Sequence, residues 1–253
     1  MSIGIMAAMQ EEINTLLREL PAHSEVIDDG QRTYHSGHLW GTPVVAVFSR
    51  WGKVAAATTA THLISDFGVE EILFTGVAGA AQPGLKVGDV VVGARMWQHD
   101  MDARPLFPRH EIPLLGRSSF ASHEKRRHQL HQAATAFLRD DLPTAASAVT
   151  RAAFHIQAAR AVEGDIASGD KFFADRAELA ELHLRLPTVA AVDMESAAVA
   201  QVCHEYSVPF TVVRTISDAA DESAAHDFPR FLRQVASAYS HGVLKRLFDD
   251  SAH

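Results

Sequence analysis

Short apolar runs that alternate with amphipathic segments dominate the chain. A nearly continuous apolar run predicts a strand covered on both faces, because such a strand turns every side chain toward the core. Two other runs, 34–39 and 44–49, predict strands joined by a hairpin-like turn at residues 40–43. The runs that predict buried strands are residues 3–9, 71–75, 87–94, 154–162, 189–192 and 210–216.

Amphipathic segments between these runs predict helices. In the first of them, Ile13, Leu16, Leu17 and Leu20 follow the 3.6-residue period of one helix face. The alternation of strands and helices predicts an α/β fold, a three-layer α/β/α sandwich around one central sheet, in a single domain over residues 1–253. Further helices are expected after Lys53 and over residues 122–138, 175–184, 195–206 and 228–248.

One long segment, residues 98–116, shows neither period. Three prolines and a mixture of aromatic and charged residues make regular structure unfavourable there. Loops of this length in compact domains are mostly functional lids or interface arms. We therefore expect an irregular arm or lid at 98–116.

Acidic residues end two of the apolar runs in the C-terminal half. Asp193 and Glu195 end one run, and Ser217 and Asp218 end the next. Open α/β sheets bind ligands at the carboxyl ends of their strands, so this pattern favours an enzyme. Each acid also has a structural alternative. Glu195 would complement a helix dipole in a first turn, and Asp218 would cap a helix.

Two loops carry residues suited to holding a flat ligand. The glycine-rich segment 76–80 lets a ligand approach the backbone closely, at Ala78 and Gly79. Phe172 and Phe173 follow a run of small residues, and such a pair suits stacking against a flat ring. A hydrophobic plug beneath the loop is the structural alternative for the two aromatics.

The composition is that of a globular protein and excludes several classes of function. Apolar residues make up 47% of the chain and charged residues 21%. The net charge of −8 argues against a nucleic-acid partner, because phosphate neutralisation needs a basic face. The first apolar run is followed at once by Glu11 and Glu12, and no run is long enough to span a bilayer. We therefore expect no signal peptide, no membrane anchor and a cytoplasmic location.

Neither cysteine nor histidine indicates a metal or cofactor. Cys203 is the only cysteine, which excludes an internal disulfide and a thiolate metal site. Its apolar helical surroundings indicate a buried, inert thiol. The 15 histidines are scattered without a helical metal-binding pattern. We expect no metal and no cofactor.

Four stretches together resemble a known family. They are IGIMAAMQEEI at the start, TGVAGA, SGDKFF, and VDMES followed by VPFTVVRTISDAAD. In order and separation they resemble the nucleoside phosphorylase superfamily of the purine and uridine phosphorylase type, and most closely the 5′-methylthioadenosine/S-adenosylhomocysteine nucleosidases. This resemblance implies a mixed, partly barrel-like sheet, a homodimer, and hydrolysis of a small adenine nucleoside to adenine and a 5-substituted ribose.

The resemblance also implies roles for individual acids. Asp218 matches the general acid that protonates the adenine at N7. Glu195 matches the glutamate that binds the ribose hydroxyls, with Met194 packed beside the sugar. Glu12 matches the residue that orients the attacking water, while Glu11 is interpreted as a surface residue. Hydrolysis of an N-glycosidic bond needs such a division between a proton-holding acid and carboxylates of lower pKa.

The remaining substrate-binding residues follow from the same resemblance. Phe172 matches the aromatic that stacks on the base, and Phe173 matches the position whose backbone reads the adenine edge. Ser217 beside the general acid, and the backbone at Ala78 and Gly79, complete the predicted set.

Two further charged residues, Asp193 and Arg214, lie near the predicted site residues in the sequence, and we predict no direct contact of either with the substrate. Asp193 stands where the best-known nucleosidases have glutamate, and its side chain is shorter. Arg214 lies four residues before Asp218 and shares a strand face with it. We interpret Arg214 as an ordering partner for carboxylates.

Departures from the family pattern bear on the substrate. Val77 replaces a serine common in the glycine-rich turn, Trp51 replaces a smaller aliphatic residue at the mouth of the 5′ pocket, and Arg50 replaces a small residue. The arm closes the 5′ pocket of the neighbouring subunit in this family, so Ala103 and Phe107 are predicted pocket residues in a partner subunit. Preference among 5′-substituted adenosines would be decided by these positions.

Two alternative functions stay open at this point. The first is a phosphorylase on the same scaffold, in which phosphate replaces water. Phosphorylases of this type carry an arginine in the loop after the first strand, where this chain has Met6-Ala7-Ala8-Met9, although Arg50 offers another cation. The second is a nucleoside-binding protein without catalysis, against which the intact Glu12, Glu195 and Asp218 argue.

Overall fold

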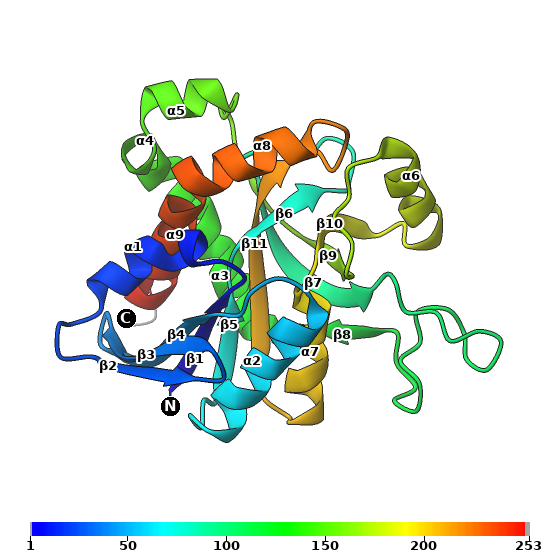
Figure 1. The fold of residues 1–253 in the computed structure, drawn as a ribbon. Helices are drawn as coiled ribbons and strands as arrows, with labels where there is room; N and C mark the ends of the chain where they lie inside the picture. Colours follow the sequence, from blue (N-terminus) through cyan, green and yellow to red (C-terminus); the bar gives the residue numbers. More distant parts are fainter. Residues whose placement is uncertain (1, 251–253) are drawn as a thin grey trace.

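A single sheet organises the chain. The computed structural model describes residues 2–250 and places eleven strands of that range in the order β2-β3-β4-β1-β5-β11-β6-β10-β9-β7-β8. An additional pairing of β11 with β7 curls the sheet into a partly closed barrel (Figure 1). The predicted α/β fold with a mixed, partly barrel-like sheet is confirmed. The strands are β1 (Ile3–Ala7), β2 (Glu25–Asp29), β3 (Arg32–Leu39), β4 (Thr42–Phe48), β5 (Glu71–Phe74), β6 (Val77–Ala80), β7 (Val90–Gln98), β8 (Ser119–Ala121), β9 (Ala161–Ser168), β10 (Val189–Asp193) and β11 (Phe210–Asp218).

Strand β11 connects the two halves of the sheet. All nine of its residues are buried, as its apolar run predicts. Its first residues pair in parallel with β5, its middle residues pair antiparallel with β7, and its last residues pair in parallel with β6. The strand therefore delivers Ser217 and Asp218 to the point where the two halves meet.

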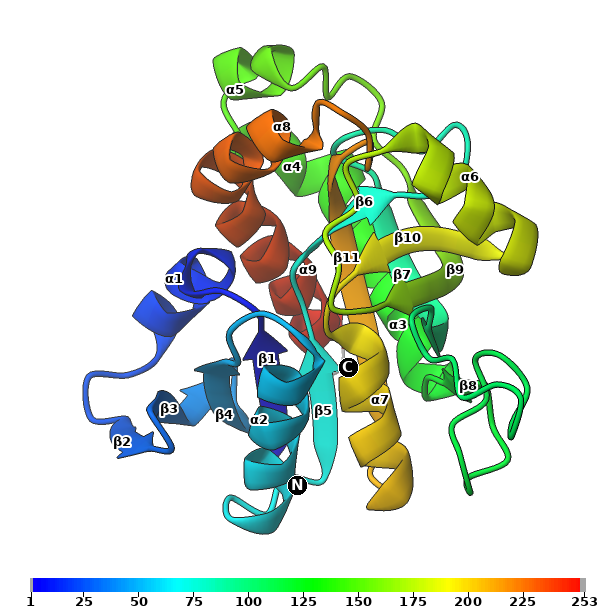
Figure 2. The same cartoon turned by 45° about the vertical axis from the view of Figure 1, so that its right-hand side comes forward.

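Helices cover both faces of the sheet and make three layers. In β1, Ile3 and Ile5 belong to the core shared with α1 and α9, whereas Met6 belongs to the core shared with α2 and α7. This alternation is the two-residue period of a strand buried on both faces. Figure 2 shows α2 and α7 side by side on one face, with α9 behind the sheet. The helices are α1 (Gln10–Glu19), α2 (Lys53–Ser65), α3 (Glu124–Ala136), α4 (Leu142–Ala145), α5 (Ala148–Ala153), α6 (Arg176–Arg185), α7 (Ser196–Glu205), α8 (Ala224–Phe231) and α9 (Ser237–Asp250), with π-helical turns η1 (Phe137–Asp141) and η2 (Leu232–Ala236).

The predicted strand at 154–162 is wrong for most of its length. Phe154 ends the short helix α5, and the strand β9 begins only at Ala161. Phe154 and Ile156 are apolar because they pack into the core, with the Phe154 ring edge-on to Phe231 at 5.4 Å between centroids. The apolar run at 154–162 therefore reflects side chains that are buried in the core, and most of it does not form a strand.

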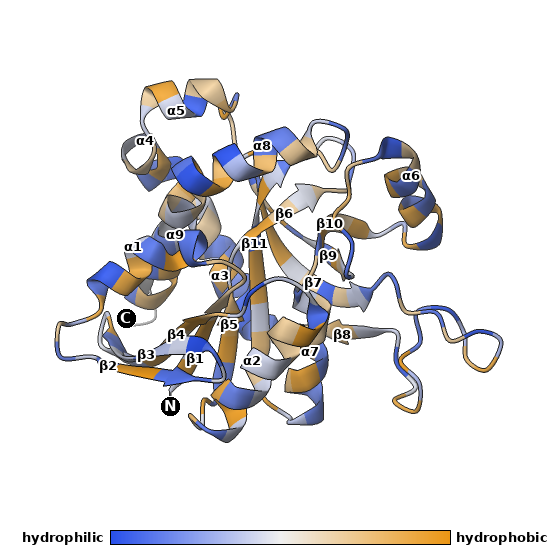
Figure 3. Cartoon of the chain, in the orientation of Figure 1, coloured by the Kyte–Doolittle hydropathy of each residue, from blue (hydrophilic) through white to orange (hydrophobic). Residues whose placement is uncertain are grey.

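Two other differences concern the element boundaries. The segment 76–80, predicted as a glycine-rich turn, is largely the buried strand β6. The last helical region begins with α8 at Ala224 rather than at 228, and Pro229 lies inside that helix. Figure 3 shows the central strands coloured mainly as hydrophobic, in contrast to the polar outer surface of α6 and α8.

The segment between β7 and β8 projects from the body of the protein (Figures 1 and 2). Its residues form no helix and only one isolated bridge, between Ile112 and Arg117. Leu106 and Leu114 on this segment are exposed. None of the helices in the described range is long and apolar enough to cross a membrane.

Candidate active site

One cavity of about 580 Å³ lies at the carboxyl ends of β1, β4, β9, β10 and β11. It lies where open α/β sheets bind ligands. All ten residues that the sequence predicts for catalysis and substrate binding line it. Its lining residues are Ala8, Met9, Glu12, Trp51, Val77, Ala78, Gly79, Lys171, Phe172, Phe173, Val192, Asp193, Met194, Glu195, Arg214, Ser217, Asp218 and Phe228.

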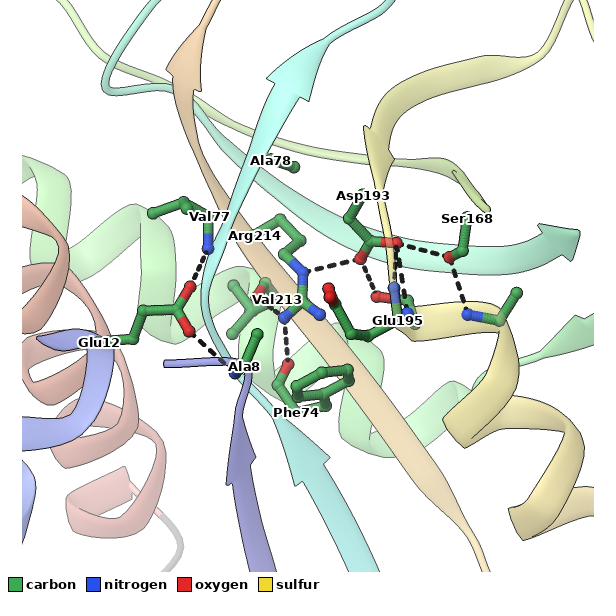
Figure 4. A network of polar contacts seen from close by, with 12 residues as sticks. Ala8, Glu12, Phe74, Val77, Ala78, Ser168, Asp193, Glu195, Val213 and Arg214 are labelled. Atoms are coloured by element: carbon green, nitrogen blue, oxygen red, sulfur yellow. Dashed lines mark hydrogen bonds and ion pairs between the residues drawn. The ribbon is translucent and has the colours of Figure 1, made fainter. Parts of the chain in front are cut away.

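Glu12 is held at the base of the cavity by three backbone amides. The N–H group of Ala8 donates to Oε2 at 2.9 Å and that of Val77 donates to Oε1 at 2.9 Å (Figure 4). The N–H group of Met9 also donates to Oε2, at 2.8 Å. Burial raises the pKa of Glu12, and the charge of Arg214 and the amide hydrogen bonds oppose that rise. The carboxylate is thus fixed in direction and kept basic enough to accept a proton.

Gly76 is required by the position of Glu12. A Cβ atom at residue 76 would lie 2.5 Å from Glu12 Oε1 and 3.3 Å from Arg214 Nη1, and φ at this position is +152°. No side chain fits in that space. The glycine before β6 therefore allows the carboxylate of α1 to reach the backbone of β6.

Asp218 lies at the opposite wall, at the end of β11. Its Oδ1 accepts a hydrogen bond from the N–H of Ala220 at 2.9 Å, and its Oδ2 accepts one from the hydroxyl of Ser217 at 2.7 Å. Burial is the main cause that raises the pKa of Asp218, helped by the charges of Asp221 and Asp227. A buried carboxyl group with a raised pKa is suited to hold and then donate a proton.

Glu195 follows β10 and reaches across to the loop after β4. The N–H of Gly52 donates to Oε1 of Glu195 at 2.8 Å, although 143 residues separate the two. Burial and the neighbouring carboxylate of Asp193 raise the pKa of Glu195 to about 8. Within the described residues its second oxygen, Oε2, has no hydrogen-bond partner, so it is available to a ligand.

This raised pKa predicts a pH-dependent stability. Between pH 4.5 and 8 the folded protein keeps a proton on Glu195 that the unfolded chain has released, so the free energy of unfolding falls as pH rises through that window. Glu195→Gln removes this cost and keeps the acceptor for Gly52. We expect a melting temperature close to wild type at pH 5 and roughly 8 °C or more above it at pH 9, from about 4 kcal/mol.

Differential scanning calorimetry from pH 5 to pH 9 measures this effect. Glu181→Gln is the control, because the Glu181 side chain is 74% exposed and pairs with Arg185 on its own helix. Its melting temperature should follow that of the wild type at every pH. An equal shift of Glu195→Gln at pH 5 and pH 9 would contradict the expected ionisation of Glu195.

Asp193 and Arg214 form a buried ion pair behind these acids. Arg214 Nε donates to Asp193 Oδ2 at 2.9 Å, and the two side chains are 1% and 2% exposed (Figure 4). Asp193 also accepts hydrogen bonds from the hydroxyl of Ser168 and from the hydroxyl and N–H of Ser196. The short aspartate thus orders Arg214 and the start of α7, in agreement with the interpretation of Arg214 as an ordering partner.

One nitrogen of Arg214 has no hydrogen-bond partner among the described residues. Its guanidinium lies 4.0 Å over the ring of Phe74, and Nη1 donates to the carbonyls of Phe74 and Val213 at 3.4 Å. Within the described part of the chain, Nη2 finds no hydrogen-bond partner although it is buried. A buried donor without a partner is costly, so this nitrogen is a candidate to bind a ligand or water.

Aromatic rings form the mouth of the cavity. Phe228 lies edge-on to Trp51 and to Phe172, at 5.7 Å between ring centroids in both cases. Phe173 is buried and lies edge-on to His99 at 5.1 Å. The rings leave flat surfaces against which a planar ligand can stack.

The comparisons with known proteins agree with this arrangement. The profile described as the Phosphorylase superfamily matches residues 2–249. The chain belongs to the phosphorylase superfamily. The predicted resemblance is therefore confirmed at the level of the family.

Several solved structures of this superfamily are similar over nearly the whole chain. The 5′-methylthioadenosine/S-adenosylhomocysteine nucleosidase from Neisseria meningitidis, in complex with methylthio-immucillin-A, is 30% identical, covers 98% of this chain and 99% of that chain, and has a TM-score of 0.86. The nucleosidase from Colwellia psychrerythraea 34H, in complex with adenine, is 32% identical, with coverages of 98% and 95% and a TM-score of 0.84. The futalosine hydrolase of Helicobacter pylori strain 26695 is 32% identical, with coverages of 98% and 97% and a TM-score of 0.82.

Arg50, considered above as a possible cation for phosphate in this superfamily member, lies outside the cavity. Arg50 is exposed, does not line the cavity, and donates to the carbonyl of Gln31 at 2.5 Å. The lining cations in the described range are Arg214, which pairs with Asp193, and Lys171, which pairs with Glu178 at 2.7 Å. Both positive charges are already neutralised by carboxylates.

Some lining residues of this superfamily member were not predicted from the sequence. Phe228 was predicted only as the first residue of a helix, and no local signal indicates that α8 returns over the cavity. Ala8, Met9, Val192 and Lys171 are the other unpredicted lining residues. Ala103 and Phe107 lie on the projecting segment and do not line this cavity. Their place in the pocket of a partner subunit stays a prediction.

One group of side chains elsewhere could hold a metal ion. In the described residues, the ligand atoms of Asp29, His62 and Asp66 lie within 4.8 Å of one another. The two carboxylates are more than half exposed, and His62 Nδ1 lies near the hydroxyl of Tyr34 at 3.3 Å. None of these residues lines the cavity, so the group has no part in the chemistry of the site.

Proposed function

We propose that this chain is a nucleosidase that hydrolyses the N-glycosidic bond of a 5′-substituted adenosine, with 5′-methylthioadenosine or S-adenosylhomocysteine as the first candidates. The products would be adenine and a 5-substituted ribose. The observation that carries the proposal is the set of three buried carboxylates, Glu12, Glu195 and Asp218, which line one cavity with separate partners. The related nucleosidases, one in complex with adenine, support the same reaction class.

Asp218 is the proposed general acid. Its raised pKa keeps a proton available, and the proton passes to the departing base as the glycosidic bond breaks and the bonding electrons move to the base. Protonation matters because a purine anion is a poor leaving group. Ser217 and the N–H of Ala220 hold the carboxyl group in one orientation.

Glu195 is the proposed partner of the sugar. Gly52 occupies one of its oxygens, and the other faces the cavity beside Met194. Ribose hydroxyls would donate to Glu195 and stabilise its ionised form. The negative charge then opposes the positive charge that develops on an oxocarbenium-like sugar.

Glu12 and Arg214 are the proposed holders of the attacking water. Glu12 is basic because it is buried, and Arg214 Nη2 is a buried donor without a partner among the described residues. A water that donates to Glu12 and accepts from Nη2 would satisfy both groups. As its oxygen bonds to the sugar carbon, its proton passes to Glu12.

Charge favours water over phosphate as the nucleophile. The two lining cations, Arg214 and Lys171, are each paired with a carboxylate, that of Asp193 and that of Glu178. A phosphate dianion would therefore enter the cavity without an unpaired cation to bind it. Hydrolysis is therefore the proposed reaction rather than phosphorolysis.

A single assay tests the reaction and its substrate. Adenine release is measured for nucleosides that differ only in the 5′ group, with and without phosphate, and the sugar product is identified. We expect free 5-substituted ribose and a rate that phosphate does not raise. Ribose 1-phosphate would show a phosphorylase instead. A clear preference for a futalosine-type nucleoside would move the substrate toward that of the Helicobacter pylori relative.

A further inference from the structure

Three segments that are distant in the sequence meet beside the cavity in a closed ring of hydrogen bonds, one of which is also an ion pair. Lys53 Nζ donates to Asp100 Oδ1 at 2.7 Å, and the N–H of Asp170 donates to Asp100 Oδ2 at 3.0 Å. The N–H of Lys53 donates to Asp170 Oδ1 at 2.8 Å. Each of the three residues therefore binds the other two. None of them lines the cavity itself.

Each segment of the ring carries a different part of the site. Lys53 begins α2 and follows Gly52, whose N–H binds Glu195. Asp170 lies two residues before Phe172 in the segment after β9. Asp100 lies at the root of the segment that projects between β7 and β8. The ring thus joins the wall that holds Glu195 to the wall that holds the stacking aromatics.

Two glycines at this junction lie close to side chains of the neighbouring segments. A Cβ atom at Gly52 would lie 3.0 Å from Asp170 Oδ1. A Cβ atom at Gly169 would lie 2.4 Å from the imidazole of His99 and 2.9 Å from Asp100 Cγ. The three segments therefore pass close to one another at this junction, where glycine leaves room for the side chains of Asp170, His99 and Asp100.

The charges keep the ring closed at neutral pH. Burial alone would raise the pKa of Asp100, but the hydrogen bonds from Lys53 and from the N–H of Asp170, with the charge of Lys53, lower it below its ordinary value. The side chains of Lys53 and Asp100 are 19% and 31% exposed, so solvent screens this pair only in part. The ring supplies three hydrogen bonds, two of them to a carboxylate that stays ionised.

We propose that Lys53, Asp100 and Asp170 act as positioning residues that set the spacing between the sugar wall and the base wall of the cavity. This inference rests on the proposed nucleosidase function. A nucleoside must contact Glu195 and the aromatic wall at the same time, whereas free adenine needs only the aromatic wall and Asp218. Loss of the ring should therefore weaken the use of the nucleoside and leave adenine binding nearly unchanged, because a misplacement of about 1 Å can cost about 100-fold in rate.

Two substitutions open the ring without touching the cavity. Lys53→Met keeps the aliphatic stem and the N–H that binds Asp170, but removes the ammonium group. Asp100→Asn keeps the shape and one acceptor, but removes the charge. We expect each to lower kcat/KM for the nucleoside at least tenfold, while the inhibition constant of adenine changes less than threefold. Lys53→Arg, which can still reach Asp100, should recover most of the loss.

A matched ion pair elsewhere provides the control. Arg127 and Glu163 also lie 2.7 Å apart, with side chains 16% and 30% exposed, and neither lines the cavity. Arg127→Met and Glu163→Gln remove a pair of similar burial and should change kcat/KM less than twofold. Thermal melting of all variants shows whether a loss of activity follows a loss of stability.

The double variant Lys53→Met/Asp100→Asn completes the test. If the two residues act through one ring, its loss should match the larger single loss rather than the product of both. Losses no larger than those of the control pair, or an equal weakening of adenine inhibition, would overturn the proposal. A wild-type enzyme that releases no adenine would instead contradict the nucleosidase function, so the two failures are distinguishable.

Discussion

Asp218→Asn is expected to lower kcat for adenine release by about 10³-fold and to change the binding of adenine less than threefold. Asparagine has the same shape, and its carbonyl oxygen can still accept from the N–H of Ala220, but it has no acidic proton to give to the base. General acid catalysis contributes about 10²–10⁴ to such reactions. Single-turnover adenine release and calorimetric titration with adenine measure the two quantities.

The neighbouring carboxylate provides the control for this loss. Asp221 lies three residues after Asp218, pairs with Arg176 at 2.8 Å and does not line the cavity. Asp221→Asn should lower kcat less than tenfold. Equal, near-zero rates in wild type and Asp218→Asn, with retained nucleoside binding, would indicate a binding protein without catalysis.

Glu12→Gln is expected to lower hydrolysis by at least about 10²-fold, because the amide cannot accept the proton of the attacking water. The loss also has a structural part. Three backbone N–H groups, of Ala8, Met9 and Val77, donate to the two carboxylate oxygens, and glutamine offers only one acceptor. At least one buried N–H group then loses its partner, which costs about 1–3 kcal/mol of stability.

Binding and melting measurements separate these two effects. Adenine binding and the melting temperature are measured with the rate, and Glu11→Gln is the control because the Glu11 side chain is exposed. Gly76→Ala tests the same carboxylate without removing it, because the added Cβ would displace Glu12 Oε1. If adenine no longer binds to a Glu12→Gln protein that melts normally, Glu12 belongs to the binding site rather than to water activation.

The cavity brings together several buried ionisable groups whose burial costs stability. Burial raises the pKa values of Glu12, Glu195 and Asp218, and Nη2 of Arg214 has no hydrogen-bond partner in residues 2–250. Each of these features lowers the stability of the empty protein, and each would be relieved by a nucleoside and a water molecule. This is the usual relation between stability and activity at an enzyme site, where groups are arranged for the ligand rather than for the fold.

Parts of the site were predictable because their signals are local. The run before Asp218 predicts a buried strand, and β11 is buried at all nine positions. The acids that follow such runs line one cavity, since the carboxyl ends of the strands gather at one edge of the sheet. The roles of Glu12, Glu195 and Asp218 come from the resemblance to the nucleosidases and stay a prediction, because residue types alone leave them open.

The wrong predictions for residues 154–162 and 76–80 also came from local sequence patterns. The run at 154–162 is apolar because Phe154 and Ile156 fill the core, and an apolar run does not distinguish a strand from a buried turn. The segment 76–80 was predicted as a turn because of its glycines, yet it pairs as β6. Glycine at position 76 serves the close approach of Glu12, which no local pattern reveals.

By itself the sequence determined the alternation of strands and helices, the burial of β11 and the acidic residues at the ends of strands, because these depend on the period and order of residues along the chain. Only the tertiary structure decided which groups touch. The bond from Gly52 to Glu195, the pairing of Asp193 with Arg214 and the ring of Lys53, Asp100 and Asp170 join residues from 21 to 143 positions apart. Such contacts depend on the crossing of strands within the sheet, and the pKa values of the acids depend in turn on the burial that those contacts create.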